Sequence, residues 1–358
     1  MKILHIVWSF NFGGIETMLV NIANEQVALG HEIGVLVVDA GKTNPDLVKT
    51  LNTHIQLFCA NRRWGTKDVF AIFRLNRIIG HFNPDAIHIH SSSIFKYLYP
   101  RYRKFSNVTL HDLCNKANTD HIGKVPRIFA ISQSVAQDLI LKKGVASMVN
   151  PNGIRPELVQ VKNSKRNGRL FRIVQVSRLE HLKKGQHILI EAGKRLLDNG
   201  VTNFAIDFIG SGSSLECLQQ LVKNNNMEAY VHFLGNKDQK YIYDILCSYD
   251  LFVQPSIYEG FGLTVAEAMA AKVPVLVSSG QGPEEVIDGG KCGYVFRNSD
   301  IEDCTGKLSM FIEGRDDKSL VEKAYQRVWN LYNVKVTTQT YIEKYIKKTN
   351  ALCSDHEK

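Results

Sequence analysis

The stretch KILHIVWSFNFGGIETMLVNIANEQVALGHEIGVLVV, residues 2–38, predicts one strand–helix–strand unit. Residues 2–8 and 32–38 are nearly continuous apolar runs, which favour buried strands. Between them, residues 16–29 carry apolar side chains at helical spacing: Met18, Leu19, Ile22, Ala23 and Val27. Two buried strands joined by a helix are typical of a parallel sheet that is covered by helices on both faces.

The same alternation continues along the chain and restarts once. Further strands are expected at residues 86–90, 108–110 and 127–131 and, after a polar segment at 150–167, at 171–176, 204–209, 231–234, 251–254 and 273–277. A chain of 358 residues is long enough for two domains. We therefore predict an α/β fold of two facing doubly wound Rossmann-like domains, residues 1–155 and 156–335, with the ligand in an interdomain cleft.

Composition restricts the partners and the cellular location. The net charge is +9, and it is uneven: residues 1–150 hold 17 Lys and Arg against 10 acidic residues, and residues 151–358 hold 27 against 25. This asymmetry suggests an anionic partner for the first domain, although a solvated basic surface would give the same count. The seven cysteines form no C-x-x-C pair, so neither disulfides nor structural zinc are expected. No signal peptide and no apolar stretch of about 18 residues is recognisable, which favours a cytoplasmic protein.

Several candidate binding loops follow directly after predicted strands. Gly13 and Gly14 stand at the start of the first helix, where backbone N–H groups favour an anion. Arg178 follows the strand at 171–176, and Lys184 comes six residues later at another helix start. Two such cations would suit a diphosphate. Gly210 begins a third loop of this kind, which lacks the full dinucleotide-binding fingerprint.

The run PSIYEGFGLTVAEAMA, residues 255–270, is the most informative loop. Its glycines free the backbone before a helix whose N-terminus faces the loop, and it contains two carboxylates, Glu259 and Glu267. A carboxylate there can accept two hydrogen bonds from ribose hydroxyls. The spacing of Thr264 and Glu267 is also that of a capping box, in which the Glu would only satisfy the helix start.

Residues 259–270, EGFGLTVAEAMA, resemble the E-G-F-G-L-x-x-x-E-A-M-A signature of family 4 retaining glycosyltransferases, which have the GT-B fold. The resemblance extends across most of the chain. It includes residues 13–16, the pair His111-Asp112, and the segments 130–132, 150–154, 177–179, 184–185, 210–212, 250–256 and 282–293. The second domain matches more specifically than the first.

The resemblance implies a role for each matching residue. In the catalytic set, Arg178 and Lys184 would neutralise the donor diphosphate, Glu259 would contact the donor sugar, and His111 would contact the transferred sugar near the reacting carbon. The other donor-binding residues would be Gly13, Gly14, Gly210, Gly262, Leu263, Thr264 and Glu267. The last of these would hold the ribose, and backbone N–H groups of residues 262–264 would face the diphosphate. A C-terminal helix, about residues 336–358, would pack back on the first domain.

The predicted function is retaining transfer of a sugar from a nucleotide-diphosphate sugar to a glycan or lipid-linked acceptor, with bacterial envelope or exopolysaccharide synthesis as the setting. The alternatives are a sugar-nucleotide epimerase of similar fold and a non-catalytic nucleotide-sugar-binding protein. No cofactor is expected, and the sequence has no D-x-D motif for a metal. His88 and His90 lie on one side of a buried strand, so they and His5 are interpreted as core residues.

A basic and aromatic segment in the first half suggests a membrane partner. Residues 95–105 interleave four cations with five aromatic residues and contain no acidic residue, and Arg62, Arg63 and Trp64 form a second small cluster. Such a surface suits anionic headgroups. The alternative is that the aromatic rings pack into the domain and only the cations face water. No nucleic-acid-binding motif accompanies the charge, so nucleic acid is not an expected partner.

Overall fold

The computed structural model describes residues 1–11, 13–39, 41, 43–62, 68–114, 119, 121–162, 170–280 and 282–348. Arg63, Trp64, most of the polar connection after residue 162 and the predicted helix beyond residue 348 lie outside these ranges. The chain divides into two compact units: Met1–Ile154 together with the segment that begins at Val334, and Arg155–Asn333.

The first unit is built on a seven-stranded sheet in the order β3-β2-β1-β4-β5-β6-β7, in which every neighbouring pair is parallel. Its strands are β1 (Lys2–Val7), β2 (Glu32–Val37), β3 (Gln56–Cys59), β4 (Ala86–Ile89), β5 (Ser106–Leu110), β6 (Arg127–Ala130) and β7 (Met148–Val149). Its helices are α1 (Gly14–Ala28), α2 (Pro45–Val48), α3 (Val69–Phe82), α4 (Pro100–Arg103), α5 (Gln133–Lys143) and α14 (Val334–Lys344), with 3₁₀ turns η2 (Ser92–Tyr97) and η3 (Ile122–Lys124).

The second unit has a six-stranded parallel sheet in the order β10-β9-β8-β11-β12-β13. Its strands are β8 (Phe171–Val176), β9 (Phe204–Ile209), β10 (Val231–Phe233), β11 (Leu251–Gln254), β12 (Val275–Ser278) and β13 (Tyr294–Phe296). Its helices are α6 (His181–Lys184), α7 (Gln186–Asp198), α8 (Leu215–Asn224), α9 (Gln239–Ile245), α10 (Leu263–Ala270), α11 (Gly282–Val286), α12 (Ile301–Ile312) and α13 (Ser319–Leu331), with η4 (Pro156–Leu158), η5 (Leu246–Ser248) and η6 (Asp288–Gly290).

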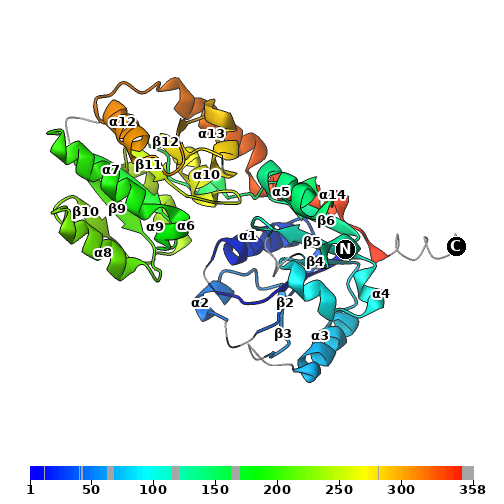
Figure 1. Ribbon diagram of the computed structural model, residues 1–358. Helices are drawn as coiled ribbons and strands as arrows, with labels where there is room; N and C mark the ends of the chain where they lie inside the picture. Colours follow the sequence, from blue (N-terminus) through cyan, green and yellow to red (C-terminus); the bar gives the residue numbers. More distant parts are fainter. Residues whose placement is uncertain are drawn as a thin grey trace. The chain divides into compact units, whose positions relative to one another are not determined.

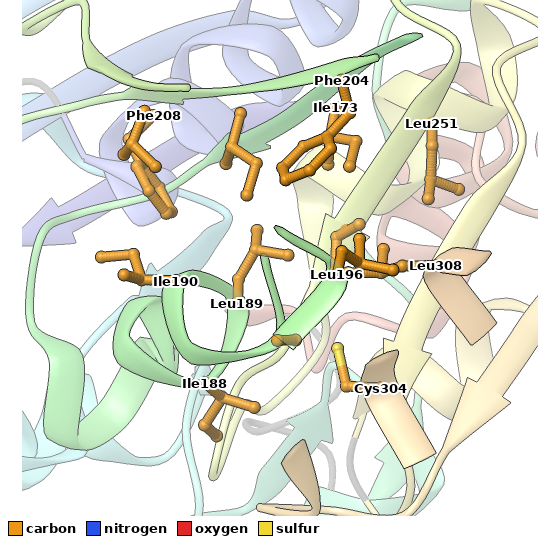
Figure 2. Packing of buried hydrophobic residues seen from close by; sticks show 14 of the residues in the cluster. Ile173, Ile188, Leu189, Ile190, Leu196, Phe204, Phe208, Leu251, Cys304 and Leu308 are labelled. Atoms are coloured by element: carbon orange, nitrogen blue, oxygen red, sulfur yellow. The ribbon is translucent and has the colours of Figure 1, made fainter. Parts of the chain in front are cut away.

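A continuous apolar core holds the second sheet to its helices. Figure 2 shows strand side chains, among them Ile173, Phe204 and Phe208, facing Leu189 and Leu196 of α7. All five side chains are buried. Since a fully buried apolar side chain stabilises a fold by about 1.5–3 kcal/mol, this core anchors the strands whose carboxyl ends lead into the candidate donor loops.

The predicted fold class, two doubly wound parallel sheets, is confirmed, and the ten strands that the sequence predicts are present with ends shifted by at most two residues. The sequence missed three strands, β3, β7 and β13. Each is at the edge of a sheet and is two to four residues long. These three edge strands are short and have one neighbour each, so they lack the long apolar run that marks an interior strand.

The C-terminal helix belongs to the first unit. In Figure 1 the chain passes from unit 2 into the red α14, which packs against α1. The chain re-enters the first unit at Val334, whose N–H donates to the Ile154 carbonyl at 2.8 Å. Tyr341 and Tyr345 are then buried in the first unit, where the Tyr341 hydroxyl lies 3.1 Å from Thr109 Oγ1 on β5.

Candidate active site

The loops that carry the predicted donor-binding residues are packed together at the carboxyl edge of the second sheet. A side chain at Gly210, where φ is +143°, would place its Cβ 2.0 Å from the Ser177 carbonyl oxygen. A Cβ at Gly185, where φ is +68°, would lie 1.8 Å from the Pro255 carbonyl oxygen. Only glycine permits these close approaches and these left-handed conformations. The loops after β8, β9 and β11 therefore form one assembly.

Lys184 and Glu259 meet within this assembly as an ion pair. The two side chains are only 15% and 17% exposed, so solvent screens their attraction less than it would at the surface. Gln254 Nε2 and Ser256 Oγ also lie 3.4 and 3.3 Å from the same carboxylate oxygen of Glu259. The structure thus brings the expected phosphate-binding cation into contact with the expected sugar-binding carboxylate, although 75 positions separate them.

The structure places Arg178 differently from Lys184. Its side chain is 62% exposed, and its guanidinium pairs with Glu180 at 3.2 Å. Its carbonyl oxygen accepts a hydrogen bond from Gln186 Nε2 at 2.9 Å, which fixes the backbone at the end of β8. An exposed Arg on a fixed backbone can turn toward an anionic ligand by changing its side-chain rotamers.

Helix α10 begins directly after the glycine loop, as its Leu263–Ala270 bounds show. Gly262 is the N-cap with φ of +100°, and Leu263 and Thr264 are the first two helical residues. The first N–H groups of a helix have no partner within it, so they are available to an anion. The capping-box interpretation of Thr264 and Glu267 is wrong, because the cap is Gly262 and Glu267 lies beyond the first turn.

Glu267 is instead a buried acid with a single hydrogen-bonding partner in the described part of the chain. Its side chain points away from bulk water, with 6% of the residue exposed. Gln239 Nε2 donates to its Oε1 at 3.4 Å, which is a long hydrogen bond. Burial raises the pKa of Glu267 to about 7. A buried carboxyl group with unused acceptor capacity is suited to a ligand that brings hydroxyl donors.

In the first unit, the predicted residues lie at the carboxyl edge of the seven-stranded sheet. Gly13 is the N-cap of α1 and Gly14 its first residue. His111 follows β5 directly and is half-buried. The backbone at Gly13 is extended, with φ of −170°, and a Cβ would meet only the carboxylate end of the Glu16 side chain, at 2.7 Å. That side chain can move, so the fold itself does not require glycine at this position.

A buried group of histidines behind His111 was not predicted as a unit. His5, His88 and His90 are buried on β1, on β4 and just after β4, and ring nitrogens of all three lie within 4.8 Å of one another. Their interpretation as buried core residues agrees with the structure. Three imidazoles at this distance could hold a metal ion, but all six ring nitrogens already have protein hydrogen-bonding partners. We therefore interpret the group as a hydrogen-bond network.

Two family descriptions together cover most of the chain. Residues 12–158 match Glycosyltransferase Family 4, and residues 158–327 match Glycosyl transferases group 1. The chain belongs to these glycosyltransferases. The resemblance seen in residues 259–270 is thereby confirmed, and the candidate donor loops lie inside the group 1 region.

Curated relatives of this glycosyltransferase align over part of its length. The Arabidopsis thaliana sulfoquinovosyl transferase SQD2 is 33% identical over 144 residues, which are 39% of this chain and 28% of that protein. The Erwinia amylovora amylovoran biosynthesis glycosyltransferase AmsK is 29% identical over 213 residues, 55% of this chain and 52% of that protein. The chain thus spans about half or less of the length of these relatives.

Solved glycosyltransferases share the fold over nearly the whole chain. A glycosyltransferase from Rickettsia africae superposes with a TM-score of 0.79 at 20% identity, covering 98% of both chains. Anabaena HepE, in complex with UDP and glucose, superposes with a TM-score of 0.80 at 20% identity, covering 96% of this chain and 98% of that one. These likenesses confirm the GT-B fold class. None of the helices in the described ranges is long and apolar enough to cross a membrane.

Proposed function

We propose that this glycosyltransferase moves a sugar from a nucleotide-diphosphate sugar to a glycan or lipid-linked acceptor, with retention at the anomeric carbon. The observation that carries the proposal is the Lys184–Glu259 pair in the loop assembly beside the N-terminus of α10. Cations and helix N–H groups suit a diphosphate, and Glu267 suits the ribose. In this proposal residues 156–335 bind the donor and residues 1–155 receive the acceptor.

We propose that the protein mainly assists the departure of the diphosphate. Glu259 is neutralised by Lys184, which makes it a poor covalent nucleophile. We therefore propose that the acceptor hydroxyl attacks the anomeric carbon on the face from which the diphosphate leaves. The bond from that carbon to the diphosphate oxygen breaks, and this oxygen takes the proton of the acceptor. Lys184, Arg178 and the N–H groups of Leu263 and Thr264 stabilise the negative charge that develops on the diphosphate.

The biological setting that we propose is polysaccharide or envelope synthesis on the cytoplasmic side of the membrane. AmsK acts in amylovoran biosynthesis, and HepE crystallised with UDP and with UDP-glucose. UDP-sugars are therefore the first donors to test. Thermal unfolding should be measured with a panel of nucleotide sugars, because a ligand that binds only the folded state raises the Tm. Product anomeric configuration then tests retention. The proposal would be rejected if no nucleotide sugar in the panel raised the Tm, or if the protein converted a donor without transferring its sugar to an acceptor.

We expect transfer to be independent of an added divalent metal, because the sequence has no D-x-D motif and Lys184 and Arg178 are proposed to neutralise the diphosphate. Initial rates with the identified donor and acceptor should be unchanged after incubation with excess EDTA. Loss of activity that Mg²⁺ or Mn²⁺ restores would contradict this expectation and would place a metal at the diphosphate.

The basic segment, residues 95–105, is partly built into the first unit. Phe95, Tyr102 and Phe105 are buried, whereas Lys96, Arg101 and Lys104 are exposed. These three aromatic rings therefore pack into the domain, as the alternative interpretation of this segment expected.

Exposed apolar side chains near the basic segment come instead from α3. Val69, Phe70 and Phe73 are 66%, 73% and 56% exposed. Helix α3 packs on the basic segment through Asn76, whose side chain donates to the Tyr97 carbonyl at 2.8 Å and accepts from the Tyr99 N–H at 2.7 Å. We propose that these apolar side chains and the neighbouring cations bind an anionic membrane surface together.

Replacing Lys96, Arg101 and Lys104 together by Ser should weaken binding to anionic vesicles about 100-fold, since each cation contributes roughly 1 kcal/mol at such a surface. Co-sedimentation with phosphatidylserine-containing and neutral vesicles at low and high salt measures the effect. The matched control replaces three exposed lysines of the second unit by Ser: Lys223, Lys240 and Lys291. Equal binding of the two triple variants, or an absence of wild-type binding at low salt, would disprove membrane attachment.

A further inference from the structure

Four side chains form a line of hydrogen bonds that ends at His111. Gln26 Oε1 lies 2.7 Å from His5 Nε2, His5 Nδ1 lies 3.0 Å from His90 Nε2, and His90 Nδ1 lies 3.2 Å from His111 Nε2. The residues come from α1, β1 and the ends of β4 and β5. Gln26, His5 and His90 are buried, and His111 is half-buried at the edge of the sheet.

The imidazoles in this line are neutral at physiological pH. Burial lowers the pKa of His5 to about 4 and that of His111 to about 4, and it lowers the pKa of His90 well below its ordinary value. A neutral imidazole has one N–H group and one lone pair. When neutral imidazoles are joined nitrogen to nitrogen, each must donate on one side and accept on the other. The line therefore has a single direction, and the group at its buried end determines that direction.

Gln26 is the group at the buried end. Its carbonyl oxygen faces His5, and its amide Nε2 faces the Tyr345 hydroxyl at 3.3 Å. That hydroxyl also lies 2.8 Å from His88 Nδ1. An amide oxygen only accepts, so His5 must carry its proton on Nε2 and accept on Nδ1. The same logic makes His90 donate through Nε2 and accept through Nδ1.

We propose that Gln26, His5 and His90 are positioning residues that hold His111 in its Nε2–H tautomer, so that the Nδ1 lone pair is the acceptor offered to a hydroxyl of the transferred sugar. The sugar contact rests on the proposed function, whereas the tautomer does not. The opposite tautomer at any one histidine would set two N–H groups or two lone pairs against each other inside the protein. A buried mismatch of this kind costs about 1–3 kcal/mol, so the line restricts His111 to one tautomer and one ring orientation.

The tautomer can be measured directly on the wild-type protein. Two-bond ¹H–¹⁵N correlation spectra of ¹⁵N-histidine-labelled protein show which ring nitrogen carries the proton, and the signals of His111 are assigned from their loss in His111→Gln. We expect the wild type to show protonated Nε2 and unprotonated Nδ1 at His111 between pH 6 and pH 8. A protonated Nδ1 at His111 would overturn the proposal, and this measurement requires neither substrate nor a folded Gln26 variant.

Gln26→Met tests the line from its far end, because methionine has similar length but no strong acceptor for His5. We expect His111 in Gln26→Met to become a mixture of tautomers, and kcat to fall about 2- to 10-fold, the effect of one net hydrogen bond. Asn21→Leu is the matched control, since it removes another buried amide from α1. In His90→Asn we expect His111 to keep its Nε2–H tautomer, because the asparagine side-chain oxygen can accept from His111 in place of His90 Nδ1.

The outcomes separate this inference from the proposed function. A Gln26→Met protein whose His111 tautomer is unchanged would overturn the inference, even if sugar transfer is confirmed. A shifted tautomer in a protein that transfers no sugar would support the hydrogen-bond line and reject the proposed function. A change of equal size in Asn21→Leu would show that general loosening of α1, rather than the line, controls His111.

Discussion

Lys184→Ala should lower the rate of sugar transfer about 10²- to 10³-fold, which is the effect of losing one preorganised group that stabilises transition-state charge. Lys184 is held beside the N-terminus of α10 by its ion pair with Glu259, so its charge needs little rearrangement when the diphosphate departs. The rate should be measured as kcat and as kcat/KM with the identified donor. The main loss should be in kcat, because the leaving charge is larger in the transition state than in the bound donor.

Replacing Lys184 and replacing Arg178 should change the free energy of unfolding by different amounts. Lys184→Ala removes the cation that pairs with the Glu259 carboxylate, which is 17% exposed. We expect a loss of about 1–3 kcal/mol from this change. Arg178 is 62% exposed, so Arg178→Ala should leave the Tm nearly unchanged. If Arg178 turns toward the diphosphate as proposed, its replacement should still lower the rate by a similar factor.

Arg195→Ala provides a control for charge alone. Arg195 forms an ion pair with Glu302 in the same unit, and its replacement should alter neither kcat nor KM. Glu259→Gln combined with Lys184→Ala should cost less than the sum of the single changes, because residues in direct contact are not independent. Near-normal turnover in Lys184→Ala at a temperature well below its Tm would reject its assignment to the leaving group.

The sequence predicted the interior strands and the candidate donor loops because both leave local signals. Interior strands are apolar runs, and residues 255–270 combine a strand end, two glycines and a helix start within one short segment. The edge strands β3, β7 and β13 leave no such signal. The capping-box alternative for Thr264 and Glu267 shows that spacing alone does not locate a helix start, because Gly262 caps α10.

Contacts between distant segments could not be predicted in the same way. The alternation at residues 86–90 places His88 and His90 on one side of a strand, but their contact with His5 requires that β1 and β4 be neighbours in the sheet. Sheet order is set by how the whole chain packs, not by any local pattern. The Lys184–Glu259 pair likewise depends on the close approach of Gly185 to Pro255, which joins the loop after β8 to the loop after β11.

Glu267→Gln should weaken donor binding about 10-fold at pH 8, because a carboxylate can accept from both ribose hydroxyls and an amide oxygen binds them less strongly. Burial raises the pKa of Glu267 to about 7, so the wild-type carboxyl group is largely protonated at pH 6 and ionised at pH 8. Donor affinity of the wild type should therefore fall several-fold between pH 8 and pH 6. The affinity of the variant should be nearly constant over this range. Isothermal titration with the donor at a series of pH values measures both effects.

The same carboxyl group should make the ligand-free protein less stable at high pH. Below its ordinary pKa of 4.5, Glu267 is protonated in both the folded and the unfolded protein and adds no pH dependence. Between pH 4.5 and about 7 the unfolded chain releases this proton while the folded protein retains it, so the free energy of unfolding falls as pH rises. The accumulated penalty above pH 7 is on the order of 3 kcal/mol. Glu267→Gln removes it, and we expect this variant to be more stable than the wild type at pH 8 and similar to it at pH 4.5. If Glu267→Gln binds the donor normally and is less stable than the wild type at pH 8, the role of Glu267 is purely structural.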